Sequence, residues 1–150
     1  MRVVRVKKQI GASLDKVWAV LADFPNIAKW NRGVNRSYAT SDATAGVGAT
    51  RHCDLAPVGT LEETIQEWQP EERLVISIDE TSRLPIKRGW MTFTMAEAGE
   101  STSYAMNYEY EPKGGPLGAI FGSVIDGRLR KGFAGFMDQL EAAARDRAPT

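Results

Sequence analysis

Residues 117–147 read LGAIFGSVIDGRLRKGFAGFMDQLEAAARDR and follow a stretch at 112–116 that is rich in proline and glycine. In the second half of this segment, apolar residues recur at the 3.6-residue period of a helix that buries one face. They are Leu129, Phe133, Phe136, Met137, Leu140 and Ala144. We therefore predict a long C-terminal helix whose second half packs in the core.

The first half of the same segment carries small or polar residues on the stripe that is apolar further on. Projected backward, the stripe passes through Gly118, Gly122, Ile125 and Asp126. Ile120 and Val124 fall on the opposite side, so we expect either a kink near Gly127 or a first half wrapped by other parts of the chain. Because small residues leave space unfilled, this first half is expected to border a ligand cavity.

Composition limits the class of protein. The 150 residues favour one domain over 1–150, with a frayed tail at 146–150. The single Cys53 excludes an internal disulfide, and the charged start lacks the apolar core of a secretion signal, so we expect a cytoplasmic location. No stretch is apolar for long enough to span a membrane. The balance of 19 basic and 19 acidic residues argues against nucleic acid as a partner. The oligomeric state stays open.

The remainder of the chain alternates between apolar and polar residues, which is typical of half-buried strands. One strand is predicted at 2–10, and two short helices follow between about 13 and 30. Six more strands are predicted at about 34–40, 48–55, 60–68 and 74–79, then around 89–95 and 104–111. This order predicts an α+β fold, with a seven-stranded antiparallel curved sheet wrapped around the C-terminal helix.

Several short motifs resemble those of the helix-grip superfamily, which includes START lipid-binding domains, plant Bet v 1-like proteins and bacterial polyketide cyclase/dehydrase proteins. They are Ile10-Gly11-Ala12-Ser13 before Val17-Trp18, Phe24-Pro25-Asn26 with Trp30, Gly48-Ala49-Thr50-Arg51, Glu63, Tyr108-Glu109-Tyr110-Glu111-Pro112 and the closing helix. The resemblance covers nearly the whole chain and implies an internal cavity. Members bind lipids, bind hormones, cyclise polyketides or regulate other proteins, so the fold alone does not select a function.

The central hairpin offers a polar group for such a cavity. If Leu61, Glu63 and Ile65 face the helix, Glu63 needs a partner, because an unpaired buried charge is costly. The short connection near Pro57 places Arg51 opposite Glu63. The pair is either a structural tether, which we favour, or an anchor for a ligand's carboxylate or hydroxyl. Arg36 is a further candidate, since it matches the position at which hormone-receptor relatives carry a ligand-binding lysine.

Apolar side chains are expected to form the cavity wall. Met and Tyr residues make an adaptable surface with hydroxyls at its edges, although core packing also accounts for them. The predicted ligand-contacting residues, beyond the three polar ones above, are Ile76, Met91, Phe93, Met106, Tyr108, Gly122, Ile125 and Asp126.

Conventional catalytic machinery is weak in this sequence. Strand alternation puts the only histidine, His52, on the face opposite Cys53, so no Cys–His nucleophile pair is predicted. No metal-ligand spacing and no phosphate-binding loop are present, and no catalytic residue, metal or cofactor is predicted.

Two functional hypotheses follow, and a third stays open. The favoured one is a non-enzymatic binder or carrier of a hydrophobic lipid, polyketide or aromatic molecule. The alternative is a polyketide cyclase or aromatase that uses Glu63, Arg51 and Tyr108 to orient its substrate and move protons. A regulatory protein with an incidental cavity is the third.

Overall fold

The computed structural model describes residues 1–147 and has the predicted α+β architecture. Its elements are β1 (Arg2–Ile10), α1 (Leu14–Ala22), the 3-10 helix η1 (Phe24–Lys29), β2 (Val34–Ala39), β3 (Thr50–Leu55), β4 (Thr60–Gln69), β5 (Arg73–Ser82), β6 (Ile86–Ala98), β7 (Ser101–Pro112), α2 (Gly115–Ile120) and α3 (Gly122–Asp146). Three residues of the tail expected at 146–150, residues 148–150, lie outside the described part of the chain.

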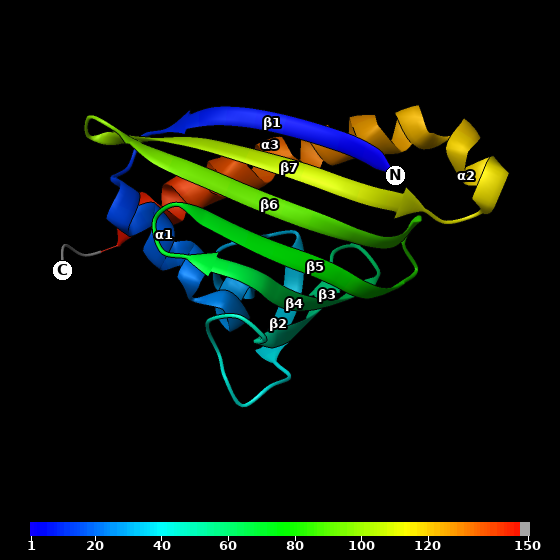
Figure 1. Ribbon diagram of the computed structural model, residues 1–150, viewed down its shortest axis with the longest axis horizontal. Helices are drawn as coiled ribbons and strands as arrows, with labels where there is room; N and C mark the ends of the chain where they lie inside the picture. Colours follow the sequence, from blue (N-terminus) through cyan, green and yellow to red (C-terminus); the bar gives the residue numbers. More distant parts are fainter. Residues whose placement is uncertain (148–150) are drawn as a thin grey trace.

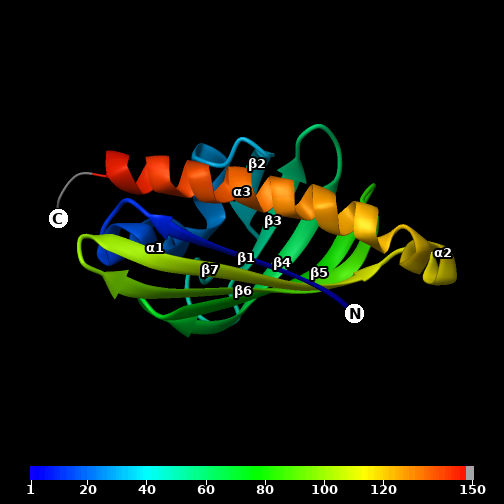
Figure 2. The same ribbon diagram turned by 90° about the horizontal axis from the view of Figure 1, so that it is seen from above.

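One seven-stranded sheet organises the molecule, in the order β1-β7-β6-β5-β4-β3-β2 with every neighbouring pair antiparallel. The sheet curves around α3, which runs along one side of it beside β1 (Figures 1 and 2). The two short helices between β1 and β2 lie on the same face of the sheet as α3, where α1 packs against α3 and η1 packs against β2 and β3. This arrangement confirms the predicted helix-grip fold.

Side-chain alternation explains why the concave face is apolar. In β7, Tyr104, Met106, Tyr108 and Tyr110 are all buried, while the residues between them are more exposed. At the C-terminal end of α3, Leu140 and Ala144 are fully buried at 0% exposure. Burial of these apolar faces against each other is the main stabilising contribution to such a fold.

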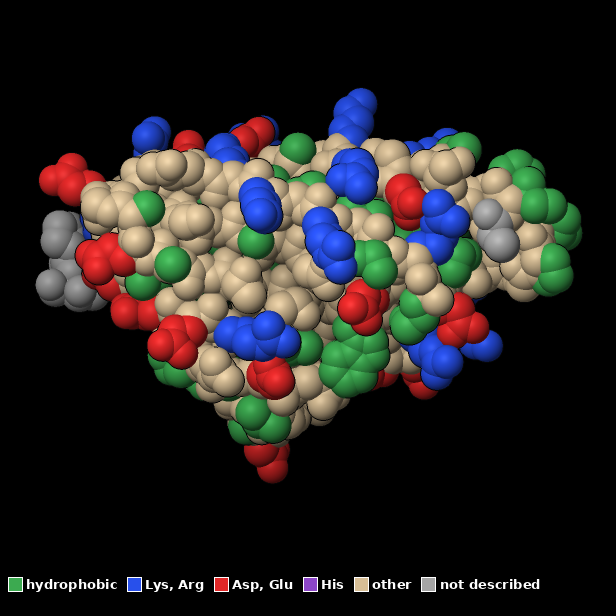
Figure 3. Space-filling view, turned by 45° about the horizontal axis from the view of Figure 1, so that its top comes forward, with side chains coloured by type: hydrophobic (Ala, Val, Ile, Leu, Met, Phe, Trp, Pro, Cys, Tyr) green, Lys and Arg blue, Asp and Glu red, His purple; other side chains and the backbone are tan. Residues whose placement is uncertain are grey.

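The closing helix is interrupted, but not at the glycine where we expected a kink. The break lies at Phe121, between α2 and α3, whereas Gly127 lies within α3. Before α2, the turn after β7 reverses the chain at Gly114 and Gly115, which adopt positive φ angles of 95° and 54°. The short α2 that follows protrudes from the molecule with apolar side chains at its surface (Figure 3).

Within residues 1–147, no helix has both the length and the apolar character needed to cross a lipid bilayer.

Candidate functional site

A pocket of about 320 Å³ lies between the concave face of the sheet and α3. Its wall is mostly apolar, and α3 closes it with the side chains of Leu129, Phe133 and Phe136. The sheet contributes the predicted residues Ile76, Met91, Phe93, Met106 and Tyr108. Five predicted apolar positions therefore do meet around one space.

A buried ion pair forms the polar part of this pocket. Arg51 Nε donates to Glu63 Oε1 at 3.0 Å, and the two side chains are only 7% and 8% exposed. The register places Arg51 opposite Glu63, as predicted from the hairpin length. Both side chains line the pocket, so the predicted inward pairing is confirmed.

Arg51 is held in place by contacts other than the ion pair. Its Nη1 donates to the carbonyl oxygen of Phe24 at 2.8 Å, and its guanidinium carbon lies 4.0 Å from the centre of the Phe24 ring. A guanidinium has five N–H donors, and the bonds to Glu63 and Phe24 use one on Nε and one on Nη1. Arg51 therefore retains donor capacity toward the pocket, in an orientation that packing on η1 defines.

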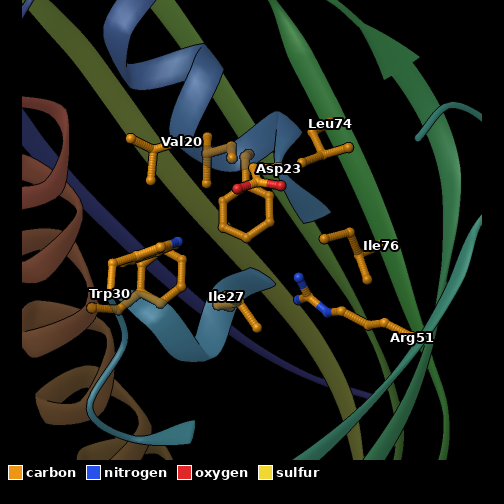
Figure 4. A pocket seen from close by; sticks show the side chains of 10 residues that line it. Val20, Asp23, Ile27, Trp30, Arg51, Leu74 and Ile76 are labelled. Atoms are coloured by element: carbon orange, nitrogen blue, oxygen red, sulfur yellow. The ribbon is translucent and has the colours of Figure 1, made fainter. Parts of the chain in front are cut away.

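The Arg51 guanidinium also reaches a second, much smaller cavity of about 10 Å³ beneath α1 and η1. Figure 4 shows Arg51 extending from its strand toward Ile27 and Trp30. A cavity of this size has room for about one water molecule. Trp30 Nε1 is buried and has no hydrogen-bond partner among residues 1–147. The polar end of the site thus continues past Arg51 into a space too small for an organic ligand.

Two further polar side chains, those of Cys53 and Tyr108, line the large pocket, and burial keeps both protonated. Burial raises the pKa of the Cys53 thiol to about 12, and the nearby Glu63 carboxylate adds to this effect. Burial likewise raises the pKa of the Tyr108 phenol above its ordinary value. Cys53 Sγ donates to Glu63 Oε1 at 3.5 Å. Near neutral pH these groups can donate hydrogen bonds but cannot act as a thiolate or phenolate nucleophile.

The prediction that Arg36 faces the cavity is wrong. Its side chain is 67% exposed and binds Asp54 on the outer face of the sheet, with Nε 3.0 Å from Oδ2. A β-bulge is responsible. Val34 pairs with Leu55 and Arg36 pairs with the adjacent Asp54, so β2 has one residue more than β3 at this point. The extra residue reverses the alternation of β2, so Ser37 faces inward and donates to the Pro25 carbonyl oxygen.

The structure also keeps Gly122, Ile125 and Asp126 away from the pocket. Arg2 occupies the space beside Gly122, where an added Cβ would collide with its guanidinium group. Asp126 accepts hydrogen bonds from Arg2 Nη2 at 2.8 Å and from the Tyr110 hydroxyl, and the Arg2 bond lowers its pKa. Ile125 packs against the core. These residues join the start of α3 to the end of the sheet.

The hollow instead lies under the next turns of α3, where we expected solid core. Leu129, Phe133 and Phe136 are only partly buried by protein because they face the pocket, and Gly132 lies beside them. Arg2 fills the space near the start of α3, and α2 turns away from the sheet, so the unfilled volume shifts toward the C-terminus. Gly132, which precedes Phe133 of the apolar stripe, is the sequence signal that could have located it.

Comparison with known proteins adds a family and a fold. Residues 1–145 match the sequence model of a family described as polyketide cyclase / dehydrase and lipid transport. No curated protein matches the chain. A similar solved structure is the Zhui aromatase/cyclase from Streptomyces sp. R1128, with a TM-score of 0.80 and 11% identity, covering 99% of this chain and 96% of that one.

Two other structures are similar to this chain at comparable coverage. A START superfamily protein from Mycobacterium smegmatis gives a TM-score of 0.68 at 16% identity, covering 92% of this chain and 98% of that one. Ara h 8.0201 gives a TM-score of 0.75 at 9% identity, covering 97% and 99%. At such low identities the similarity is one of fold.

Proposed function

Because this chain belongs to the polyketide cyclase / dehydrase and lipid transport family, within the START and Bet v 1-like helix-grip superfamily, we propose that it binds or carries a hydrophobic small molecule. The pocket between the sheet and α3 is the proposed site. Its apolar wall with one buried polar end, formed by Arg51 and Glu63, is the observation that carries the proposal.

The size and chemistry of the pocket limit the ligand. A volume of about 320 Å³ is near the lower end of the range for small-molecule sites, which is about 300–1,000 Å³. The donors of Arg51 and Tyr108 favour a ligand with an acceptor oxygen at one end, such as a ketone, phenol or carboxylate. The rest of the ligand would be apolar or aromatic, to suit the Met and Phe side chains of the wall.

Native mass spectrometry of the protein purified from its own host tests this proposal. We expect a retained small molecule, or saturable binding of the probe 1-anilinonaphthalene-8-sulfonate to emptied protein, with Arg51→Met weakening binding of the anionic probe. Absence of both a retained molecule and saturable probe binding would exclude the carrier function.

A polyketide cyclase or aromatase is the second candidate, favoured by the convergence of Arg51, Glu63 and Tyr108 on one pocket. Such an enzyme would use the donors to hold a poly-ketone in a folded shape and to stabilise an enolate during ring closure. Incubation with a poly-β-ketone thioester distinguishes the two functions. A cyclase should release a cyclised product, and Tyr108→Phe should slow turnover more than it weakens binding. A carrier should return the substrate without enzyme-dependent cyclisation.

A further inference from the structure

The tip of the molecule formed by α2 and the first residues of α3 exposes four large apolar side chains. Leu117, Ile120, Phe121 and Val124 are 65%, 68%, 60% and 54% exposed. Figure 3 shows hydrophobic side chains gathered at this end of the surface. Large apolar residues that cluster at a surface are a mark of an interaction site.

The apolar tip is followed on α3 by a basic stripe formed by Arg128 and Lys131. Backbone bonds from Phe121 N to Leu117 O, and from Val124 N to Phe121 O, keep the break between α2 and α3 close to helical. Phe121 and Val124 are therefore followed on the outer side of α3 by Arg128 and Lys131, at helical spacing. Both cations are exposed.

Charge is strongly one-sided in this part of a chain whose formal net charge is +0. From Lys113 to Met137 the only acidic residue is Asp126, and Arg2 is hydrogen-bonded to it. The cations of the same stretch are Lys113, Arg128, Arg130 and Lys131. The surface around the apolar tip is consequently positive.

We propose that this tip docks onto the surface of an anionic lipid bilayer. Exposed apolar side chains beside lysine and arginine are the pattern that places a helix at the boundary of headgroups and acyl chains. Anionic headgroups complement the positive stripe, while the four apolar side chains insert. The tip protrudes from the molecule, so it suits a soft lipid surface better than the large complementary face that a stable protein interface requires.

The same stretch of α3 would link docking to the pocket. Arg128 and Gly132 line the pocket, so a bilayer bound along this stripe lies next to the pocket wall. Docking rests on the apolar tip and the cations beside it and does not depend on which molecule the pocket holds.

Vesicle flotation of the full-length chain tests the proposal. We expect wild-type protein to float with vesicles of 70% phosphatidylcholine and 30% phosphatidylglycerol, and to stay unbound with pure phosphatidylcholine. Leu117→Ser with Phe121→Ser should lower partitioning about tenfold or more, and Lys113→Glu with Lys131→Glu about tenfold. Val47→Ser is the matched control, because Val47 is an equally exposed apolar residue, 67% exposed, that lies in the loop before β3.

The outcomes separate this proposal from its alternatives. Wild-type protein that stays unbound on anionic vesicles, or a double-serine variant that floats as well as wild type, overturns it. Self-association in sedimentation velocity that the double-serine variant abolishes, without flotation of the wild type, would assign the tip to a second copy of the chain instead. Thermal unfolding of each variant checks that the fold is retained, which the exposure of all four altered positions leads us to expect.

Discussion

At the scale of single residues, the Arg51–Glu63 pair sets the polarity of the pocket. Glu63→Gln removes the negative charge that balances a guanidinium of which only 7% is exposed. We expect the free energy of unfolding to fall by about 3 kcal/mol, because an uncompensated buried charge is costly. Chemical denaturation of the purified variant measures this loss.

The double replacement Arg51→Met and Glu63→Leu is the matching control. It should recover more than half of the loss, since apolar residues of similar size can replace a buried pair. Recovery should be incomplete, because the Phe24 carbonyl oxygen loses its donor. A double variant as unstable as Glu63→Gln would show that the cost arises from packing and not from the stranded charge.

Because Gly89 has no side chain, it leaves the space that the Tyr108 hydroxyl occupies at the pocket wall. A Cβ at position 89 would lie 2.9 Å from both the Tyr108 hydroxyl and the Glu109 carbonyl oxygen. Gly89→Ala should therefore cost about 1–3 kcal/mol, because backbone as well as side chain must move. In contrast, Gly127→Ala has nothing within 4 Å of the new Cβ and should be neutral or stabilising, by up to about 1 kcal/mol. Thermal unfolding of the two variants should show a lower midpoint than wild type for Gly89→Ala and an unchanged or higher midpoint for Gly127→Ala.

His52 on the outer face makes stability depend on pH. Its Nε2 lies 2.7 Å from Asp54 Oδ1 and its Nδ1 contacts Glu62, and hydrogen bonds to Glu62 and then Asp54 raise its pKa above the ordinary 6.5. A raised folded-state pKa stabilises the fold fully below 6.5, and this stabilisation is lost as the pH rises through the folded-state pKa. The stability advantage of wild type over His52→Gln should thus shrink as the pH rises from below 6.5 to above the folded-state pKa of His52. An advantage that stays constant over this range would contradict the prediction.

At the scale of elements, α3 combines a core helix and a pocket wall. Gly132 lies at the pocket, and an added Cβ there meets nothing within 4 Å. Gly132→Leu should keep or raise stability by up to about 1 kcal/mol, because glycine is a poor helix former, while weakening ligand uptake by filling space. Gly127→Leu is the control, since Gly127 is also unhindered but does not line the pocket. Probe titration of both variants should reveal weaker uptake for Gly132→Leu alone.

The elements differ in how well they can be predicted from the sequence. Alternation and the length of the β3–β4 connection suffice to pair Arg51 with Glu63, because a short hairpin has one register that buries its apolar face. The same alternation misplaces Arg36, because the bulge in β2 has no clear mark in the residue pattern. The break at Phe121 is missed for a similar reason, since phenylalanine is not a helix-breaking residue and Gly127, where a kink was expected, lies within α3.

At the scale of the whole molecule, the fold is predictable and the position of the hollow is not. The order of strands and helices leaves one antiparallel arrangement that covers the apolar stripe of α3, and the structure has it. The hollow depends on the volume that every side chain leaves empty. Arg2 fills the space at Gly122, more than a hundred residues away in sequence, and no periodicity reports such a contact.

Ligand binding should stabilise the molecule as a whole. A ligand that binds only the folded state, present at about 100 times its dissociation constant, raises the free energy of unfolding by about 2.7 kcal/mol. Thermal unfolding of emptied protein with increasing amounts of the retained molecule should therefore show a rising midpoint. Gly132→Leu should flatten this rise, whereas Gly127→Leu should not.

The two edge strands of the sheet, β1 and β2, affect the tendency of the protein to aggregate at high concentration. An open sheet exposes unpaired backbone groups along its outermost strands, and such edges can add strands from neighbouring chains. Here β2 is short and bulged, and Arg36 projects from it. At the other edge, α3 lies along β1 and Arg130 Nη1 donates to the Arg5 carbonyl oxygen at 3.0 Å. The bulge that moves Arg36 out of the pocket thereby also guards the sheet against fibril-like growth, so a variant that deletes Asn35 should aggregate faster at high concentration.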